Sequence, residues 1–180
     1  MQGDPNQQFD TSRISQYFND ILLIQQIQQA VEDNNLKKFH DFSLTREDLL
    51  GMRLKHNLNI LQATAYFGAE LILKYLTKFF IVDEDAKKEL VEYREPNGGN
   101  MAIHFAVLKG NKRIIDFLIN DFHADPYVLT SNGLSVMHCS AQFERGVLSL
   151  EMFNRKEYTF DVNCRDKFQC SPLHFAVLNL

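Results

Sequence analysis

Residues 171–180 read SPLHFAVLNL, a histidine between a proline–leucine step and an apolar run. The same shape returns in residues 101–110 (MAIHFAVLKG) and 135–144 (SVMHCSAQFE). Glutamine replaces the histidine in residues 59–68 (NILQATAYFG), and a weaker copy lies at 25–34 (QQIQQAVEDN). Recurrence of a ten-residue pattern indicates an internal repeat, which decides the fold before any single residue is interpreted.

The fourth residue of each copy marks the period of the repeat. These markers are Gln28, Gln62, His104, His138 and His174, spaced by 34, 42, 34 and 36 residues. A unit of about 33 residues with small insertions accounts for all four spacings. Glycines follow two of the copies, at Gly68 and Gly110. We treat both glycines as further markers of the unit.

A second amphipathic stretch follows each copy. Apolar residues recur there at helical spacing, for example in AELILKYLTKFF after Gly68 and in NKRIIDFLINDF after Gly110. That spacing predicts one buried helix face per unit. Polar turns rich in Gly, Asn and Asp separate the units, as in residues 97–100 (NGGN) and 131–133 (SNG). Two short helices bury too little area alone, so the units are expected to stack.

This arrangement resembles the ankyrin repeat. Residues 171–176 (SPLHFA) nearly reproduce that family's T-P-L-H-x-A helix, and residues 124–126 and 161–163 match its turn. The resemblance covers residues 20–180, although the first two units carry Gln at the His position and lack Pro. It implies an all-α solenoid of helix-turn-helix units joined by β-hairpin-like tips.

The period divides the chain into a polar N-terminus and an array. The predicted boundaries are a disordered segment 1–13, a cap 14–54, repeats 55–96, 97–129 and 130–165, and a partial repeat 166–180. The 42-residue spacing exceeds a 33-residue unit by nine residues, which fall in 81–96 with a net charge of −3. We expect an extra helical turn there that projects from the array. Because the last copy lacks its second helix, we expect a longer parent protein.

Composition excludes several classes of function. The 180 residues carry a net charge of −4, which disfavours nucleic acid or an anionic membrane as partner. Three cysteines, an odd number without a CxxC pair, favour a reducing compartment, so we expect a cytoplasmic location. The polar N-terminus lacks the apolar core of a signal peptide, and no window is apolar enough to span a membrane.

No catalytic or metal site is predicted. One histidine per unit places the rings roughly 10 Å apart, too far to share an ion. We expect each ring to hydrogen-bond the next hairpin backbone; a weak role at a site is the alternative. Ser135 and Ser171 are interpreted as helix N-caps, and Cys139 as a small core residue. We expect no cofactor, metal or small-molecule substrate.

The remaining functional prediction is a protein-binding surface. In ankyrin arrays partners usually contact the hairpin tips and the exposed end of the first helix, which together form a concave face. Carried over by position, the binding residues are Tyr66, Phe67, Asn100, Lys109, Gln142, Phe143, Lys167 and Phe168. Aromatic anchors ringed by polar residues are typical of binding hot spots. Two alternatives remain: some aromatics pack into the neighbouring unit, or the acidic insertion 81–96 docks a basic partner.

A narrower resemblance concerns residues 133–142, 149–153, 160–166 and 171–174. These stretches are similar to the ankyrin segment that precedes the membrane domain in DHHC-type palmitoyltransferases. That likeness implies a substrate-recruiting part of a protein S-acyltransferase at the cytosolic face of a membrane. The chain holds no Asp-His-His-Cys tetrad, so we expect no enzymatic activity in these residues.

Overall fold

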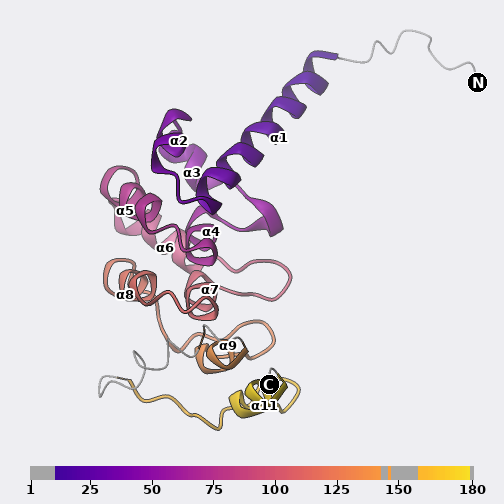
Figure 1. Cartoon of the computed structure of the whole chain (residues 1–180), viewed down its shortest axis with the longest axis vertical. Helices are drawn as coiled ribbons and strands as arrows, with labels where there is room; N and C mark the ends of the chain where they lie inside the picture. Colours follow the sequence, from indigo (N-terminus) through magenta and orange to yellow (C-terminus); the bar gives the residue numbers. More distant parts are fainter. Residues whose placement is uncertain (1–10, 143–145, 147–157, 179–180) are drawn as a thin grey trace, which may run out of the picture.

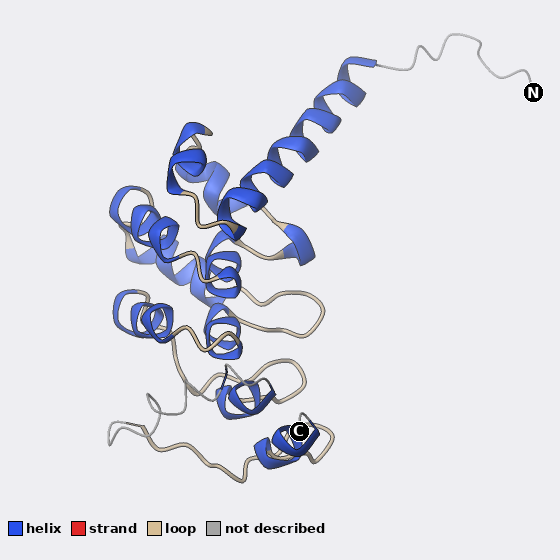
Figure 2. Ribbon diagram, viewed as in Figure 1, coloured by secondary structure: helices blue, strands red, loops and turns tan. Residues whose placement is uncertain are grey.

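The computed structural model describes residues 11–142, 146 and 158–178. Its helices are α1 (Thr11–Glu32), α2 (Leu36–Asp41), α3 (Arg46–Gly51), η1 (Lys55–Asn57), α4 (Ile60–Phe67), α5 (Glu70–Phe79), α6 (Glu84–Glu92), α7 (Ala102–Leu108), α8 (Lys112–Asp121), α9 (Val136–Gln142) and α11 (Pro172–Leu178). Figure 2 shows only helix and loop in this part of the chain. The all-α prediction is confirmed.

The helices form two columns. Helices α4, α7, α9 and α11 follow one another down the first column, each in contact with the next, and α5 and α8 lie in the second (Figure 1). Loops project from the side of the first column, and backbone hydrogen bonds close them. Examples are Thr130 N–H to Leu134 O at 2.9 Å and Asp166 N–H to Cys170 O at 3.0 Å. The solenoid with hairpin-like tips is therefore confirmed.

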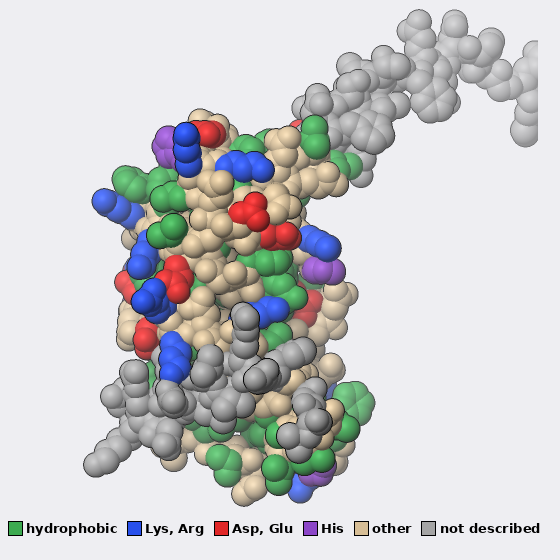
Figure 3. Space-filling view, viewed as in Figure 1, with side chains coloured by type: hydrophobic (Ala, Val, Ile, Leu, Met, Phe, Trp, Pro, Cys, Tyr) green, Lys and Arg blue, Asp and Glu red, His purple; other side chains and the backbone are tan. Residues whose placement is uncertain are grey.

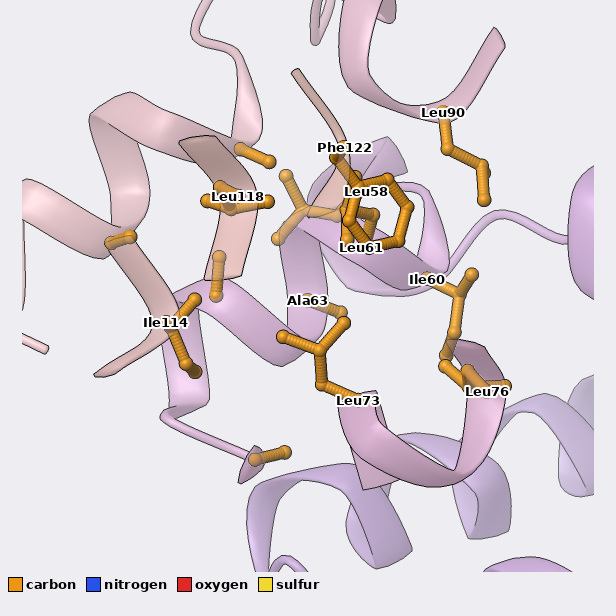
Figure 4. Packing of buried hydrophobic residues seen from close by; sticks show 14 of the residues in the cluster. Leu58, Ile60, Leu61, Ala63, Leu73, Leu76, Leu90, Ile114, Leu118 and Phe122 are labelled. Carbon is orange, nitrogen blue, oxygen red and sulfur yellow. The ribbon is translucent and has the colours of Figure 1, made fainter. Parts of the chain in front are cut away.

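A continuous apolar core joins the units. Leu61 of α4, Leu76 of α5 and Ile115 of α8 are all fully buried. Figure 4 shows labelled side chains of α4, α5, α6 and α8 gathered in this core. No single helix pair could bury these side chains alone, so the stability of each unit depends on its neighbours.

Local signals set the helix ends. Asn59 caps the start of α4. Its side chain accepts a hydrogen bond from the Gln62 N–H, and the Gln62 side chain accepts one from the Asn59 N–H. Helix α4 ends at Gly68, whose φ of +74° lies in the left-handed region. Gly110 takes a φ of +66° at the same position of the next unit. Both glycines let the chain turn at once into the second helix.

The N-terminal unit differs from its predicted form. Helix α1 begins at Thr11, three residues before the predicted boundary at residue 14, while residues 1–10 lie outside the described range. The short second helix α2 was expected, whereas α3 was not. Thr45 and Asp48 start α3 with a reciprocal capping box, a signal that the amino-acid sequence carries in plain view.

The prediction that the insertion projects from the array is wrong. Its helix α6 contacts α4 and buries Ala86, Leu90 and Val91. The Asn59 side chain donates to the Leu90 carbonyl at 2.8 Å, which fixes α6 against the start of α4. Burial of an apolar face outweighs the excess of acidic residues, since the acidic side chains of α6 itself are exposed. The extra helix itself was correctly expected.

Candidate protein-binding surface

The two glutamine markers connect their units to the next tip. Gln28 Oε1 accepts a hydrogen bond from the Lys55 N–H at 3.1 Å. Gln62, which is fully buried, donates through Nε2 to the carbonyls of Tyr93 and Asn100, both at 2.9 Å. In both units a side-chain amide thus reaches from a helix to the backbone of the following tip.

Two histidine markers make the same connection with an imidazole. His104 Nε2 lies 3.1 Å from the Val128 carbonyl oxygen, and Nδ1 accepts from the Met101 N–H at 3.1 Å. Since a carbonyl can only accept, Nε2 carries the hydrogen and the ring is neutral. Burial lowers the pKa of His104 from 6.5 to about 4. His138 repeats the pattern with the Cys170 carbonyl at 3.1 Å, so the expected interrepeat bonds are present at both positions.

His174 has only the inner half of this pattern in the described part of the chain. Its Nδ1 accepts from the Ser171 N–H at 3.1 Å, and the Ser171 hydroxyl lies 2.7 Å from the same atom. The side chain is exposed, unlike those of His104 and His138. The marker histidines therefore share a local geometry but differ in burial.

Buried polar residues hold the hairpin tips together, and sequence reasoning missed them. Glu95, Thr130 and Asp166 lie at the bases of the three tips and are 6%, 6% and 4% exposed. Thr130 Oγ1 accepts from the Leu134 N–H, and Asp166 accepts from the N–H groups of Phe168 and Cys170. Their spacing of 35 and 36 residues matches the repeat, a signal concealed by three different residue types.

Glu95 shows how such a residue tolerates burial. Burial alone would raise its pKa, but hydrogen bonds from the Asn100 side chain and from the N–H groups of Asn97, Asn100 and Gly98 bring the pKa below its usual value. The carboxylate is therefore ionised at neutral pH and acts as a scaffold for the tip. It is not a free base for chemistry.

Adjacent tips are linked through their backbones. The Ser131 N–H donates to the Gly98 carbonyl at 2.9 Å, and the Lys167 N–H donates to the Asn132 carbonyl at 2.9 Å. These bonds join the three tips into one connected edge (Figure 1). Side chains on the tips are therefore presented in a fixed order along one side of the first helices.

Three predicted binding residues line one groove. Tyr66 and Phe67 from the end of α4 and Asn100 from a hairpin tip border a cavity of about 350 Å³, together with Phe105 of α7. The ring of Tyr66 meets those of Phe67 and Phe105 edge to face, with centroids 4.9 and 5.7 Å apart. Lys109 places its Nζ 4.1 Å from the Tyr66 ring centroid. Four of the eight residues are thus brought to one place.

The other predicted residues lie further along the array. Lys167 and Phe168 belong to the last described tip, where Phe168 is 74% exposed. Gln142 is half-buried at the end of α9, and Phe143 lies outside the described residues. Phe105, which sequence reasoning missed, also lines the groove, where its ring meets Tyr66 of the preceding unit; its place directly after the marker His104 could have identified it.

The match to known proteins follows the same units. A family model described as ankyrin repeats (many copies) matches residues 61–119, which extend from α4 into α8. Residues 61–119 are ankyrin repeats. No curated protein matches the chain. The likeness to the ankyrin segment of palmitoyltransferases therefore stays a prediction.

Ankyrin repeats are generally protein–protein interaction modules and are typically non-catalytic. Within the described residues no group of three or more His, Cys, Asp and Glu side chains is placed to hold a metal ion. In the same part of the chain no helix is both long and apolar enough to cross a bilayer. The ankyrin architecture and the groove on it thus direct attention to protein binding.

The serines of the ankyrin motif do not act as predicted. The expected bond from a helix amide to the hydroxyl has no counterpart among the described contacts of Ser135. Its hydroxyl instead lies 2.9 Å from His138 Nδ1, which also accepts from the Ser135 N–H at 3.1 Å. Because His138 Nε2 donates to a carbonyl, Nδ1 is the acceptor and the serine donates. The Ser135 hydroxyl therefore donates to the His138 ring instead of accepting from a helix amide.

The cysteines also fit a structural reading. Cys139 is 3% exposed inside α9, and burial raises the pKa of its thiol to about 12. It therefore stays protonated and packs as a small apolar side chain, as predicted. Cys164 Sγ lies 3.4 Å from Ser135 Oγ at the junction of two ankyrin units.

Proposed function

We propose that this chain is a scaffold that binds a protein partner through the concave groove between its hairpin tips and first helices. The aromatic cluster at the groove carries the proposal: Tyr66, Phe67 and Phe105 stay partly exposed although most neighbouring apolar side chains of α4 and α7 are fully buried. Partly exposed aromatic rings within a polar border are the usual anchors of protein interfaces.

The groove offers both shape and polarity to a partner. Its volume of about 350 Å³ falls in the range of about 300–1,000 Å³ typical of ligand pockets. Asn97 and Asn100 supply amide groups on the tip side, and Lys55 and Glu32 supply charges at the other border. A partner segment can bury an apolar side chain among the rings while its backbone meets these polar groups.

The proposed contact surface continues beyond the groove. Lys167 and Phe168 on the last tip, with Gln142 and Phe143 on the way, complete the surface that the ankyrin resemblance predicts. The 74% exposure of Phe168 supports this extension, because the ring is accessible to a partner on the last tip. A long surface of this kind favours an extended partner over a compact one.

Packing also explains part of the aromatic cluster. Tyr66 of α4 touches Phe105 of α7, so this ring pair joins two units as well as lining the groove. Removal of either ring would therefore change stability and binding together. Lys109 and Phe168, which are exposed, separate the two effects.

The decisive experiment selects peptides from a displayed library on the full chain and measures their affinity for variants. Lys109→Ala and Phe168→Ala should each weaken the selected peptides about tenfold, as expected for hot-spot residues. Phe79→Ala is the matched control, since Phe79 is 57% exposed on α5 in the second column. If the peptides bind all three variants as tightly as the wild-type chain, the groove proposal is refuted.

We further propose a cytoplasmic location and no catalytic step within these residues. The alternative function, recruitment of substrates for a membrane S-acyltransferase, would use the same groove. No observation on this chain favours it over general partner binding.

A further inference from the structure

A second groove lies at the N-terminal end of the array, between α1 and the pair α2–α3. It encloses about 430 Å³ and shares no residue with the concave groove. Its apolar side is formed by Leu23, Ile24 and Ile27 of α1 facing Phe42 and Met52. Two helical walls, with no free strand edge among the described residues, leave side chains as the main means of recognition.

The apolar wall is unusually exposed. Ile27 is 1% exposed, but Leu22, Leu23 and Ile24, on the preceding turn, are 53%, 40% and 36% exposed. In Figure 1 the N-terminal part of α1 extends away from the other helices. Leu23 and Ile24, which line the groove, therefore leave apolar surface there that gains from being covered.

Every charged residue that lines the groove is acidic. These residues are Asp20 of α1 and Glu47 and Asp48 of α3. Hydrogen bonds from the backbone and hydroxyl of Thr45 hold the pKa of Asp48 below its ordinary value, so this carboxylate is ionised at neutral pH. Arg46, the neighbouring cation, is directed to Asp83 at 2.7 Å. The border of the groove is therefore negative.

We propose that this groove docks an amphipathic helix of a partner protein, with an apolar face flanked by lysine or arginine. An apolar floor with an acidic border is complementary to such a helix in both shape and charge. The two grooves share no lining residue, so this partner would not use the contacts proposed for the concave groove.

Two other occupants are disfavoured by charge. The N-terminal segment 1–10 (MQGDPNQQFD) carries Asp4 and Asp10 and no basic side chain. A second copy that offered the same groove would bring the same three acidic residues face to face, as a two-fold interface requires. Like charges at such a contact oppose association. A basic partner helix avoids both conflicts.

Two synthetic helical peptides test the proposal on the full chain. Both have leucines at positions i, i+3, i+4 and i+7, and one is flanked by lysines and the other by glutamates. We expect binding of the lysine peptide alone, with amide shifts at Leu23, Ile24 and Met52 in NMR spectra. No binding of the lysine peptide, or equal binding of both, would overturn the proposal.

Two variants locate the interaction. Asp20→Asn with Glu47→Gln removes two border charges without touching the capping box of Asp48, and should weaken the lysine peptide about fivefold. Leu23→Glu should abolish binding, whereas Leu71→Glu, at 53% exposure on α5, is the matched control and should have no effect. An unchanged affinity in the first two variants, or a loss in the control, would contradict the assigned site.

Discussion

The junctions at Gln62 and His104 solve one problem with two side chains. Each residue sits at the same place in its helix, accepts a hydrogen bond from the N–H three residues earlier, and donates to the next hairpin. Gln62 reaches two carbonyls, whereas His104 reaches one. The family's histidine is therefore one of at least two residue types that can connect neighbouring units.

The chemical difference lies in titration. An amide does not titrate. Burial holds the pKa of His104 near 4, below its ordinary value of 6.5, so between these pH values the ring is neutral in the folded state and takes up a proton on unfolding. The junction of Gln62 should then be insensitive to mild acid. The junction of His104 should weaken as the solution is acidified.

The largest effect is expected where two hydrogen bonds cross the junction. Gln62→Ala removes the hydrogen bonds to the carbonyls of Tyr93 and Asn100 and the bond from the Asn59 N–H, which should lower the free energy of unfolding by about 3 kcal/mol. Urea unfolding followed by circular dichroism measures it. Gln29→Ala, on the exposed side of α1, should change little. A loss below about 1 kcal/mol for Gln62→Ala would show that its bonds are dispensable.

Acid should separate the two junction types. A histidine with a folded pKa near 4 contributes stability that is complete above pH 6.5 and is lost as the pH falls from 6.5 towards 4. Between pH 7.5 and 4.5 the wild type should therefore lose about 2 kcal/mol more than His104→Gln, which keeps the hydrogen bond without the titration. Urea titrations at the two pH values give the difference. Parallel losses in both proteins would remove the assigned role of His104.

The glycine after α4 tests whether the units share their turn geometry. Gly68→Ala puts a side chain on a residue with a φ of +74°, and its Cβ would lie 3.1 Å from the side-chain nitrogen of Asn111. The substitution should therefore destabilise the chain by about 1–2 kcal/mol. Gly51→Ala is the matched control, because no atom lies within 4 Å of its Cβ. Thermal unfolding of both variants makes the comparison. Equal melting temperatures would show that the turn after α4 relaxes freely.

The smallest effect is expected at the last marker. His174→Ala removes a local contact of an exposed ring, so it should cost less than about 0.5 kcal/mol, whereas the equivalent change at buried His138 should cost about 2 kcal/mol. Hydrogen exchange of α9 and α11 reads each junction separately. Comparable losses of stability at the two positions would mean that burial of the marker histidine does not determine its contribution.

The period predicted the architecture, because spacing survives where individual residues do not. It identified Gln62 as equivalent to His104, although one side chain is an amide and the other an imidazole. It could not recognise Glu95, Thr130 and Asp166 as one structural position, because a carboxylate and a hydroxyl satisfy the same tip through different contacts. Local side-chain substitution thus concealed a regular feature.

Tertiary packing accounts for the other differences. Insertions in repeat arrays usually form loops on one face, which favoured an outward position, but Leu90 and Val91 turn α6 inward against α4. The aromatic groove joins Tyr66 with Phe105, nearly 40 residues later in the chain, so its geometry depends on how two units stack.

In Figure 3 hydrophobic side chains also gather over the C-terminal unit, where Leu173 and Leu178 are exposed.

The backbone links between tips have a consequence for how new specificities can arise. The bonds from Ser131 to Gly98 and from Lys167 to Asn132 use peptide groups only, so they do not depend on which side chains the tips carry. Exposed tip residues such as Asn97, Asn132 and Phe168 can therefore be exchanged at little cost to folding. A collection of variants randomised at these positions would sample many binding preferences on one unchanged frame.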